Sequence, residues 1–254
     1  MKIAVCVKHA VDEAELKIGP GGSPLLAGAA GKMSTFDKNA VEEGLRLKAA
    51  HQGEVVVFMV GGTESKKTLK EALAMGADRG VLVTADTVAI DALRTATMLA
   101  AAMKRSGPFD VVICSEGASD TYTGQVPPMV GELLGIPYVG YARKIEIDGK
   151  AAKIERSLED SVESVEAAVP FATSVVSEIN DPRYPTLIQI MQASKKPVEE
   201  LNGEEIAPAG SRRGVEVLSM SSQPTARKHV MIDGSPDEAA AKLLDALSKE
   251  GVLK

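Results

Sequence analysis

The stretch VVICSEGASDTYTGQVPPMVGELLG, residues 111–135, has the pattern of an apolar strand, a polar loop and a helix. Loops in this position of an α/β fold often bind phosphate. This loop contains no Lys, no Arg and no Gly-x-x-x-x-Gly-Lys motif. Asp120 within it would serve either as a cap or as an acceptor for a ribose or base group. Any ligand must therefore be held without a cation from the loop itself.

Neutral donors are concentrated in this loop. The helix that follows it would present unpaired N–H groups and a partial positive charge at its N-terminus. Thr121, Thr123 and Gln125 add neutral donors, and Gly117 and Gly124 allow close approach to the backbone. We expect the loop to hold the phosphate of a ligand that stays bound, because no metal or general acid is supplied for hydrolysis. The alternative is a Ser/Thr-capped loop with no ligand.

The rest of the N-terminal half repeats the same strand and helix alternation. Four apolar runs are nearly continuous in Val, Ile, Leu or Cys: residues 2–8, 54–60, 79–84 and 109–115. Strands buried on both faces have this pattern. Four helical segments accompany them: residues 34–50, 63–75, 89–106 and 125–134. The alternation predicts an α/β fold with a doubly wound, mostly parallel sheet of the Rossmann-like, adenine-nucleotide-binding kind.

Two further local patterns mark the boundaries of elements. Ser34 opens the first helical segment and Asp37 follows three positions later, which is a capping-box pattern. After Gly135, two alternating stretches flank Asp148-Gly149 and predict a hairpin. Residues 163–178 add further strand, so we expect an antiparallel extension of the same sheet.

The C-terminal part has a different composition. We expect an α/β nucleotide-binding domain over residues 1–194 and an extended arm over residues 195–254. Residues 195–234 contain few apolar side chains, so this segment either packs on a partner or is a floppy tail. Residues 235–251 have a Ser cap, a Pro at the first helical position and a Gly after the end, and such a well-capped helix favours docking on a partner.

Composition excludes several classes of protein. The chain has 254 residues with 44% hydrophobic and 25% charged residues, as in an ordinary globular protein. A net charge of −6 argues against a general nucleic-acid binder. An aromatic content of 3% with no Trp argues against a base-stacking surface. The start of the chain lacks a signal-peptide pattern and no run approaches the ~18 apolar residues of a membrane span, so we expect a cytoplasmic protein.

No catalytic or metal-binding constellation stands out. Cys6 and Cys114 each lie in an apolar run without metal-ligand spacing, which indicates buried thiols. The three histidines are His9, which could line a pocket after the first strand, His51 near a helix end, and His229 in a basic part of the tail. We therefore expect no catalytic residues in this chain, and any chemistry must come from a cofactor.

Several stretches together resemble the β (small) subunit of electron transfer flavoproteins. VCVKHAVD resembles the first strand of that family and its exit, and NAVEEGLRLK (39–48) resembles one of its helices. EALAMGADRGVLV (71–83) is the most specific match, because Ala-Met-Gly-Ala-Asp-Arg is close to a signature. GASDTYTGQVPP resembles the nucleotide loop, and INDPRYPTLIQIMQASKKP (179–197) resembles the docking segment.

The resemblance implies an electron carrier subunit without an active site of its own. Its partner would be an α subunit that holds most of an FAD, in a heterodimer reduced by flavin dehydrogenases such as acyl-CoA dehydrogenases. The acceptor would be another oxidoreductase or a membrane quinone reductase. The β chain of the family holds an adenine nucleotide, and carried over by position the contacts would be Cys6, Ser34, Thr35, Phe36, Asp37, Val60, Ser115, Glu116, Gly117, Ala118, Ser119, Asp120, Thr121, Tyr122, Thr123, Gly124, Gln125 and Val126.

The family divides over which nucleotide this cleft holds. Ordinary members carry AMP, whereas electron-bifurcating members place a second FAD here. Thr123-Gly124-Gln125-Val126 is closer to the loops of the bifurcating type. Ser119-Asp120-Thr121-Tyr122 departs from both types, because it replaces the usual Asp-Gly-Asp or Asp-Asp-Asp and keeps only one acid. We favour AMP, since it is the commoner ligand, and keep a second FAD as the alternative.

The docking segment has a physical reading of its own. Pro182 and Pro185 would hold it extended, and Thr186 would cap a short helix with Leu187, Ile190 and Met191 on one side. Exposed apolar side chains beside lysines suit brief contact with several partners. The resemblance implies that Leu187 anchors partner dehydrogenases, with Arg183 and Tyr184 beside it. The alternative is that Leu187 packs inward.

A protein of another class remains as an alternative function. A stand-alone adenine-nucleotide enzyme or sensor can have a similar fold. An ATP pyrophosphatase needs Ser-Gly-Gly-x-Asp-Ser after the first strand, where this chain has VKHAVDEAE. A stress-type sensor needs a Gly-x-x-Gly phosphate loop before its last strand, and the sequence does not show one.

Overall fold

The computed structural model describes residues 1–254 except 27, 88–89, 209–213, 223–228 and 254. Within the described residues, one sheet contains nine strands: β1 (Lys2–Cys6), β4 (Glu54–Gly61), β5 (Arg79–Thr84), β6 (Val111–Ser115), β7 (Tyr138–Asp148), β8 (Ala151–Ser157), β9 (Val162–Ala168), β10 (Phe171–Val175) and β11 (Val198–Asn202). Their order is β11-β5-β4-β1-β6-β10-β7-β8-β9. The strands from β11 to β7 are parallel, and β8 and β9 extend the sheet in antiparallel pairing.

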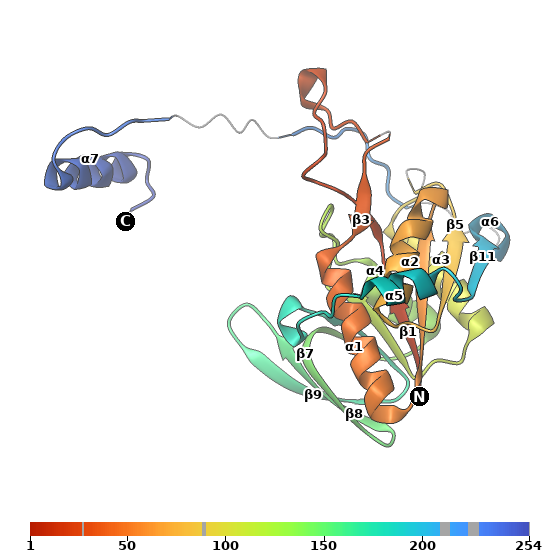
Figure 1. Cartoon of the computed structure of the whole chain (residues 1–254). Coiled ribbons are helices and arrows are strands. Elements are labelled where there is room, and N and C mark those ends of the chain that lie inside the picture. Colours follow the sequence, from red (N-terminus) through yellow and green to blue (C-terminus); the bar gives the residue numbers. More distant parts are fainter. Residues whose placement is uncertain (27, 88–89, 209–213, 223–228, 254) are drawn as a thin grey trace.

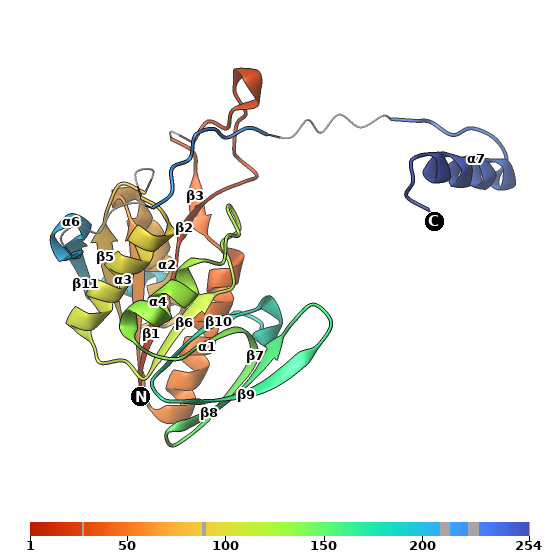
Figure 2. The same cartoon turned by 180° about the vertical axis from the view of Figure 1, so that it is seen from behind.

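Helices cover both faces of the parallel part, as the continuous apolar runs predict. They are α1 (Thr35–His51), α2 (Lys66–Met75), α3 (Ala92–Ser106) and α4 (Val126–Leu134). Helices α1 and α2 pack on one face with Ile3 and Val5 of β1, and α3 and α4 pack on the other with Ala4 and Cys6. Figures 1 and 2 show these two layers from opposite sides. The α/β architecture with a doubly wound, mostly parallel sheet is therefore confirmed.

The hairpin predicted around Asp148-Gly149 joins β7 and β8 and is also confirmed. The expectation for residues 163–178 was only half right. β9 does belong to the antiparallel extension, but β10 pairs in parallel with both β6 and β7 near the centre of the sheet. All five residues of β10 are buried, and a short, fully buried run cannot be assigned to one sheet direction from its composition.

Some elements were not predicted. Residues after β1 form β2 (His9–Val11), which pairs with β3 (Gly31–Met33) in a separate two-stranded sheet, with the short 3-10 helix η1 (Pro20–Gly22) between them. Short 3-10 helices also precede α2 (η2, Thr63–Ser65) and follow β10 (η3, Ser177–Ile179). Because β2 and β3 are three residues each, they give almost no periodic signal in the sequence.

The chain beyond β10 crosses the helical layer before it returns to the sheet. It passes over α1 and α2, forms the short helix α5 (Leu187–Ala193), and then adds β11 beside β5, followed by α6 (Gly203–Ile206). The expected division of the chain at residue 194 stays a prediction. However, β11 lies past that position and belongs to the main sheet, so the body of the α/β unit extends at least to Ala207.

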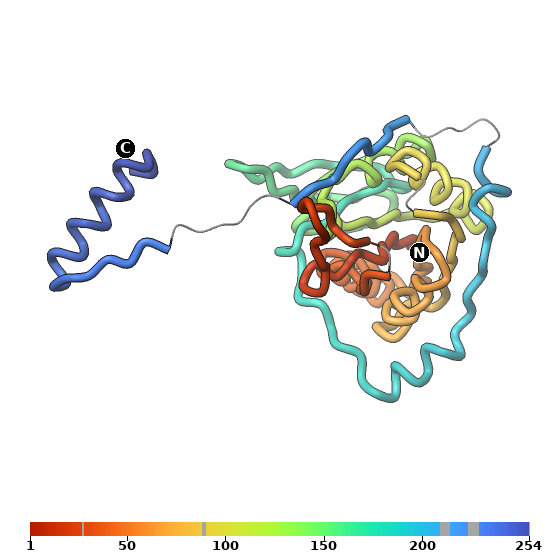
Figure 3. The backbone as a smooth tube through the Cα atoms, turned by 90° about the horizontal axis from the view of Figure 1, so that it is seen from above, coloured from red at the N-terminus to blue at the C-terminus, as the bar shows by residue number. Residues whose placement is uncertain are grey.

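Hydrogen bonds join the described part of the arm that follows to the body, at the start of α3 and at η1. Asp91, the N-cap of α3, accepts hydrogen bonds from the backbone N–H groups of Gly214 and Val215 at 2.6 and 3.0 Å. Ser222 N–H donates to Gly22 O at 2.7 Å, which brings the arm to the η1 loop (Figure 3). The terminal helix α7 (Pro236–Lys249) begins at the predicted Ser235 cap, which forms a capping box with Glu238, and has no buried residue. Within the described residues, no helix is both long and apolar enough to cross a membrane.

Candidate functional site

The strand order fixes where a ligand site would lie. The chain goes from β1 outward through β4 and β5, and then returns to place β6 on the opposite side of β1. In doubly wound sheets, ligands usually bind in a crevice beyond the carboxyl ends of the strands at such a reversal, which here are the ends of β1 and β6. The two strands end at Cys6 and Ser115, and α1 begins at the same edge. Most of the residues expected to form the site gather at this edge of the sheet.

Asp37 connects the three elements that meet there. Its carboxylate lies 2.5 Å from Ser115 Oγ and accepts a hydrogen bond from the Lys8 backbone N–H at 2.7 Å. The side chain is buried, and burial raises the pKa of Asp37 to about 7, although its hydrogen bonds work in the opposite direction. The predicted capping box with Ser34 is wrong. Asp37 instead contacts the backbone N–H of Lys8, just after β1, and the hydroxyl of Ser115 at the end of β6.

Ser34 also turns away from its own helix. It is the N-cap residue of α1 by position, but its side chain makes no capping hydrogen bond. Its hydroxyl instead accepts a hydrogen bond from the Ser119 backbone N–H at 3.2 Å, and so holds the loop after β6. The hydroxyl of Ser119 is buried and has no hydrogen-bond partner within the described chain. An orphaned buried hydroxyl is uncommon and indicates that a further group completes this site.

A cation reaches the loop from another element. Lys8 Nζ lies 2.7 Å from Asp120 Oδ1 and 3.2 Å from Thr121 Oγ1, and the Val11 N–H donates to the other Asp120 oxygen at 3.1 Å. Burial works to raise the pKa of Asp120, but the hydrogen bond and charge of Lys8 outweigh it and the pKa is lowered. Asp120 is therefore an anchor between the loop and the β1–β2 connection. The loop has no cation of its own, but it is not free of positive charge.

An aromatic pair forms one side of the loop. Tyr122 has a left-handed backbone with φ of 44°, which is uncommon for a bulky residue. Its ring meets the Phe36 ring edge-on at 5.4 Å between centroids and lies directly over Gly117, where a Cβ atom would be 2.8 Å from the ring. Burial raises the pKa of Glu116, which contacts the Tyr122 hydroxyl. Gly117 is thus required beneath the ring.

The start of α4 offers fewer donors than the sequence led us to expect. Pro127 and Pro128 occupy the second and third positions of the helix and have no N–H. Within the described chain, no hydrogen bond uses the backbone N–H groups of Thr123, Gly124, Gln125 or Val126. Gly124 has φ of 62°, a conformation that favours glycine. The available donors therefore come from the last residues of the loop and the first of the helix.

The remaining predicted contacts line the strand ends. Cys6 and Val60 end neighbouring strands and are almost fully buried. The predicted buried thiols are confirmed: contact with the Cys114 thiol and burial both raise the pKa of Cys6, so it stays protonated. His9 lies in β2 and hydrogen-bonds through Nδ1 with Thr68 Oγ1 at 2.7 Å. Thr35 is not brought toward the crevice in the same way, because it lines a recess beside the docking segment.

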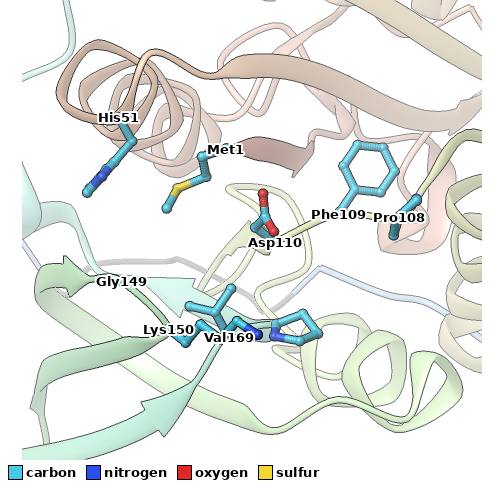
Figure 4. Close-up of a pocket in the computed structure, with 9 residues that line it drawn as sticks. Met1, His51, Pro108, Phe109, Asp110, Gly149, Lys150 and Val169 are labelled. Carbon is cyan, nitrogen blue, oxygen red and sulfur yellow. The ribbon is translucent and has the colours of Figure 1, made fainter.

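A sizeable recess lies elsewhere in the described part of the molecule. It has a volume of about 530 Å³ and lies at the opposite, amino-terminal edge of the sheet, among Met1, His51, Asp110, Lys150 and Val169 (Figure 4). Asp110 there accepts a hydrogen bond from the Lys2 N–H at 2.7 Å. The negative ends of helix dipoles face this edge, which disfavours phosphate. We therefore place the candidate site at the carboxyl edge, where the donors converge, and not in this recess.

The docking segment presents the surface that was expected. The predicted cap at Thr186 is confirmed and forms a capping box with Gln189, and α5 exposes Leu187, Ile190 and Met191. Leu187 is 80% exposed, so the alternative that it packs inward is wrong. Tyr184 is 90% exposed, whereas the Arg183 guanidinium is paired with Glu42 on α1. The described residues contain no group of three His, Cys, Asp or Glu side chains placed to hold a metal ion.

The strand order defines the class of protein: an α/β protein with a doubly wound sheet. Its expected ligand site lies at the carboxyl ends of β1 and β6, where the strand order reverses. The family model of the electron transfer flavoprotein domain matches residues 25–206 of this chain. The chain is similar over its whole length to proteins named electron transfer flavoprotein subunit beta. That of Thermoanaerobacterium thermosaccharolyticum is 34% identical over 261 residues, with 100% of each chain covered.

Two further relatives with the same name agree. The protein of Clostridium acetobutylicum is 35% identical over 257 residues, covering 98% of this chain and 99% of its own. That of Bacillus subtilis is 32% identical over 254 residues, covering 98% of each chain. The chain therefore belongs to the electron transfer flavoprotein family, among its beta subunits.

Proposed function

We propose that this chain is the β subunit of a heterodimeric electron transfer flavoprotein and holds AMP as a structural ligand at the carboxyl edge of β1 and β6. The observation that carries the proposal is the set of unused donors at that edge. The N–H groups from Thr123 to Val126 and the buried Ser119 hydroxyl have no partner within the described chain. A phosphate group accepts several hydrogen bonds at once and would satisfy such a set.

The charges around the edge fit a nucleotide that is bound but not converted. Lys8 is engaged by Asp120, so this lysine is not free to neutralise a leaving phosphate. Asp37, with a pKa of about 7, adds less repulsion toward a phosphate than an ordinary carboxylate would. These features support a nucleotide that stabilises the fold of the loop. They do not supply a base or a metal for hydrolysis.

The electron-carrying group in this proposal is an FAD held mainly by an α subunit. When bound, it supplies the redox chemistry, because the side chains of this chain have no redox role of their own. This chain would contribute a wall beside that FAD, a rigid platform and a docking surface. Electrons would come from flavin dehydrogenases such as acyl-CoA dehydrogenases and pass to an acceptor oxidoreductase or a membrane quinone reductase.

The α subunit would rest on the C-terminal arm. Helix α7 has no buried residue, yet Leu243 and Leu244 are 47% and 58% exposed along it. Val217 and Leu218 of the preceding segment are also exposed. Apolar side chains left uncovered on a capped helix and on the segment before it are typical of a surface that a partner covers.

Donor dehydrogenases would dock on α5. Tyr184, Leu187 and Met191 are 90%, 80% and 74% exposed and lie within one short segment. A small apolar surface of this kind can bind and release quickly, as an electron carrier requires. We therefore assign docking of electron donors to this segment, as distinct from the arm that holds the α subunit.

A direct test is to express the chain with and without an α subunit, purify the product, and extract the nucleotides with acid. One FAD and one AMP per heterodimer is the expected result. Two FAD and no AMP would show the electron-bifurcating type instead, an alternative favoured by the sequence Thr123-Gly124-Gln125-Val126. ATP hydrolysis by the chain alone, without a flavin-containing complex, would contradict the proposed function and favour a stand-alone nucleotide enzyme.

A further inference from the structure

The docking segment, residues 180–196, is a bridge between two distant strands. It starts after η3, crosses the outer surface of α1 and α2, and ends where β11 pairs with β5. Its helix α5 buries only Ala193. A recess of about 250 Å³, lined among others by Lys38, Met75 and Tyr184, lies between residues 182–185 and the helices beneath them. Apolar packing therefore does little to fix its position.

Polar contacts fix the first end of the segment. Arg183 donates through Nε and Nη2 to the two Glu42 oxygens at 2.7 and 3.0 Å, and its backbone N–H donates to Glu42 Oε2 at 3.2 Å. The Glu42 side chain is only 6% exposed. Arg183 holds the pKa of Glu42 below its usual range, although burial works to raise it. A bidentate contact with a buried carboxylate fixes the orientation of the guanidinium group as well as its distance.

A second pair of side chains supports the same end. Asn39 Nδ2 donates to Asn180 O at 2.8 Å and to Ser177 O at 3.1 Å. In return, Asn180 Nδ2 donates to Asn39 O and to Glu43 Oε2, each at 3.1 Å. These amides are buried, so the backbone of the segment leaves α1 along one path. The contacts of Asn180 therefore fix the backbone three residues before Arg183, which helps to place the guanidinium group next to Glu42.

The second end of the segment is fixed on a different helix. Lys196 Nζ donates to Leu73 O at 2.8 Å and to Ala77 O at 2.6 Å, at the C-terminus of α2. The carbonyl groups at a helix C-terminus lack intrahelical partners and attract a cation. Burial lowers the pKa of Lys196. Lys196 thus binds carbonyl groups at the C-terminus of α2 and anchors the chain just beyond α5.

We infer that Arg183 and Lys196 are positioning residues for donor docking: they fix the two ends of the segment on α1 and α2, so that Leu187 is presented on a preformed surface. The inference rests on the proposed function, in which α5 is the docking surface. A surface ordered before contact loses less conformational entropy when a partner binds. Release of either end would therefore weaken docking without changing the flavin or the transfer step.

The test uses the purified heterodimer as the varied substrate of an acyl-CoA dehydrogenase supplied with its acyl-CoA. We expect Leu187→Ala and Arg183→Gln each to raise KM for the heterodimer by about tenfold, with kcat changed less than about twofold. Lys196→Met should have a similar effect on KM. Arg46→Gln is the matched control, because Arg46 Nε also contacts Glu42, at 3.4 Å, but does not belong to the docking segment.

Positioning is distinguished from general destabilisation by the double variant. If Arg183 acts only by presenting Leu187, then Arg183→Gln should raise KM less than about twofold in the Leu187→Ala background. Hydrogen exchange gives a second readout that needs no dehydrogenase. Arg183→Gln and Lys196→Met should speed exchange in residues 184–193, and exchange in β5 should stay unchanged.

The two proposals fail in different ways. If Leu187→Ala leaves KM unchanged, the assignment of docking to α5 is wrong, whatever the Arg183 variants show. If Leu187→Ala raises KM but Arg183→Gln does not, the positioning role is wrong. A full effect of Arg183→Gln in the Leu187→Ala background, or unchanged exchange in residues 184–193, also overturns it.

Discussion

The Asp37 carboxyl group and the Ser115 hydroxyl lie 2.5 Å apart although 78 positions separate them in the chain. Ser115 Oγ is also 3.0 Å from Gly117 O. A hydroxyl group has one proton, so it can donate to Gly117 O only if it accepts from Asp37. Both contacts are hydrogen bonds when the Asp37 carboxyl is protonated, which agrees with its pKa of about 7.

The variant Asp37→Asn tests this protonation, because an amide reproduces the donor and acceptor of a protonated carboxyl group. The pKa of Asp37 is raised from 3.8 to about 7 on folding. The folded state therefore binds the proton more tightly, and the contribution of Asp37 to stability is complete below about pH 4 and is lost as pH rises through 7. The free energy of unfolding of the wild type relative to Asp37→Asn should fall by up to roughly 4 kcal/mol over that range.

Urea unfolding of both proteins at a series of pH values between 4 and 8 measures this difference. Other titrating groups are common to the two proteins, so their effects cancel in the comparison. Parallel stability curves for the two proteins would show that Asp37 is an ordinary carboxylate. The same scan on Asp37→Ala, which loses both hydrogen bonds, should show a loss of stability at every pH.

Lys8→Met should weaken AMP binding. The substitution leaves the Asp120 carboxylate, whose side chain is 12% exposed, without its cation and close to the site expected for the phosphate. We expect a loss of AMP affinity of about tenfold to a hundredfold, because an unpaired buried carboxylate repels the ligand and loosens the loop. Calorimetric titration of the nucleotide-free heterodimer with AMP measures the change.

Lys17→Met is the control for the Lys8 variant, since Lys17 is an exposed lysine outside the crevice. Equal AMP affinity in the Lys8 variant and the control would mean that the contact between Lys8 and Asp120 does not shape the site.

Gly117→Ala should destabilise the loop because the new Cβ atom would lie 2.8 Å from the Tyr122 ring. We expect a cost of about 1–3 kcal/mol, as for other insertions into filled space. The double variant Gly117→Ala, Tyr122→Ala should recover most of this loss, since the alanine at position 122 removes the ring. Thermal unfolding of the heterodimer gives the comparison, and a second substitution that brings no recovery would show that the backbone at Gly117 is the cause.

Leu244→Glu should prevent assembly without unfolding the α/β body. Leu244 is 58% exposed on α7, which contributes no buried residue, so a charge there costs the isolated chain little. Gel filtration after co-expression should show separate subunits, with the unfolding midpoint of this chain unchanged. Lys249→Ala, which removes an exposed ion pair on the same helix, should leave the heterodimer intact.

The sequence was sufficient for four strands of the central sheet, but not for the direction of β10 or for the edge strand β11. Continuous apolar runs identified β1, β4, β5 and β6, because burial on both faces leaves no polar position in a strand. β11 was missed since its exposed edge is polar and only Leu201 of its five residues is buried. A polar edge strand cannot be told from a loop by composition.

The site shows the same limit. The loop at 115–126 and the start of α1 were identified from local patterns, and the structure brings them together. Lys8 was missed because its partner Asp120 lies 112 positions away, and no short pattern joins them. The one signal available was topological: a lysine that follows the first strand ends at the same edge as the loop. Ser34 and Asp37 were predicted to serve their own helix, but long-range partners outcompeted the local cap.

The path from β10 to β11 has a consequence for how this protein could diversify. Both ends of this crossing connect to strands of the main sheet. The exposed helix α5 between them buries only Ala193. A substitution at an exposed position of α5 should therefore change neither the stability of the fold nor nucleotide binding. Relatives could therefore differ at a few exposed residues of α5 and so accept electrons from different donors, with the rest of the molecule unchanged.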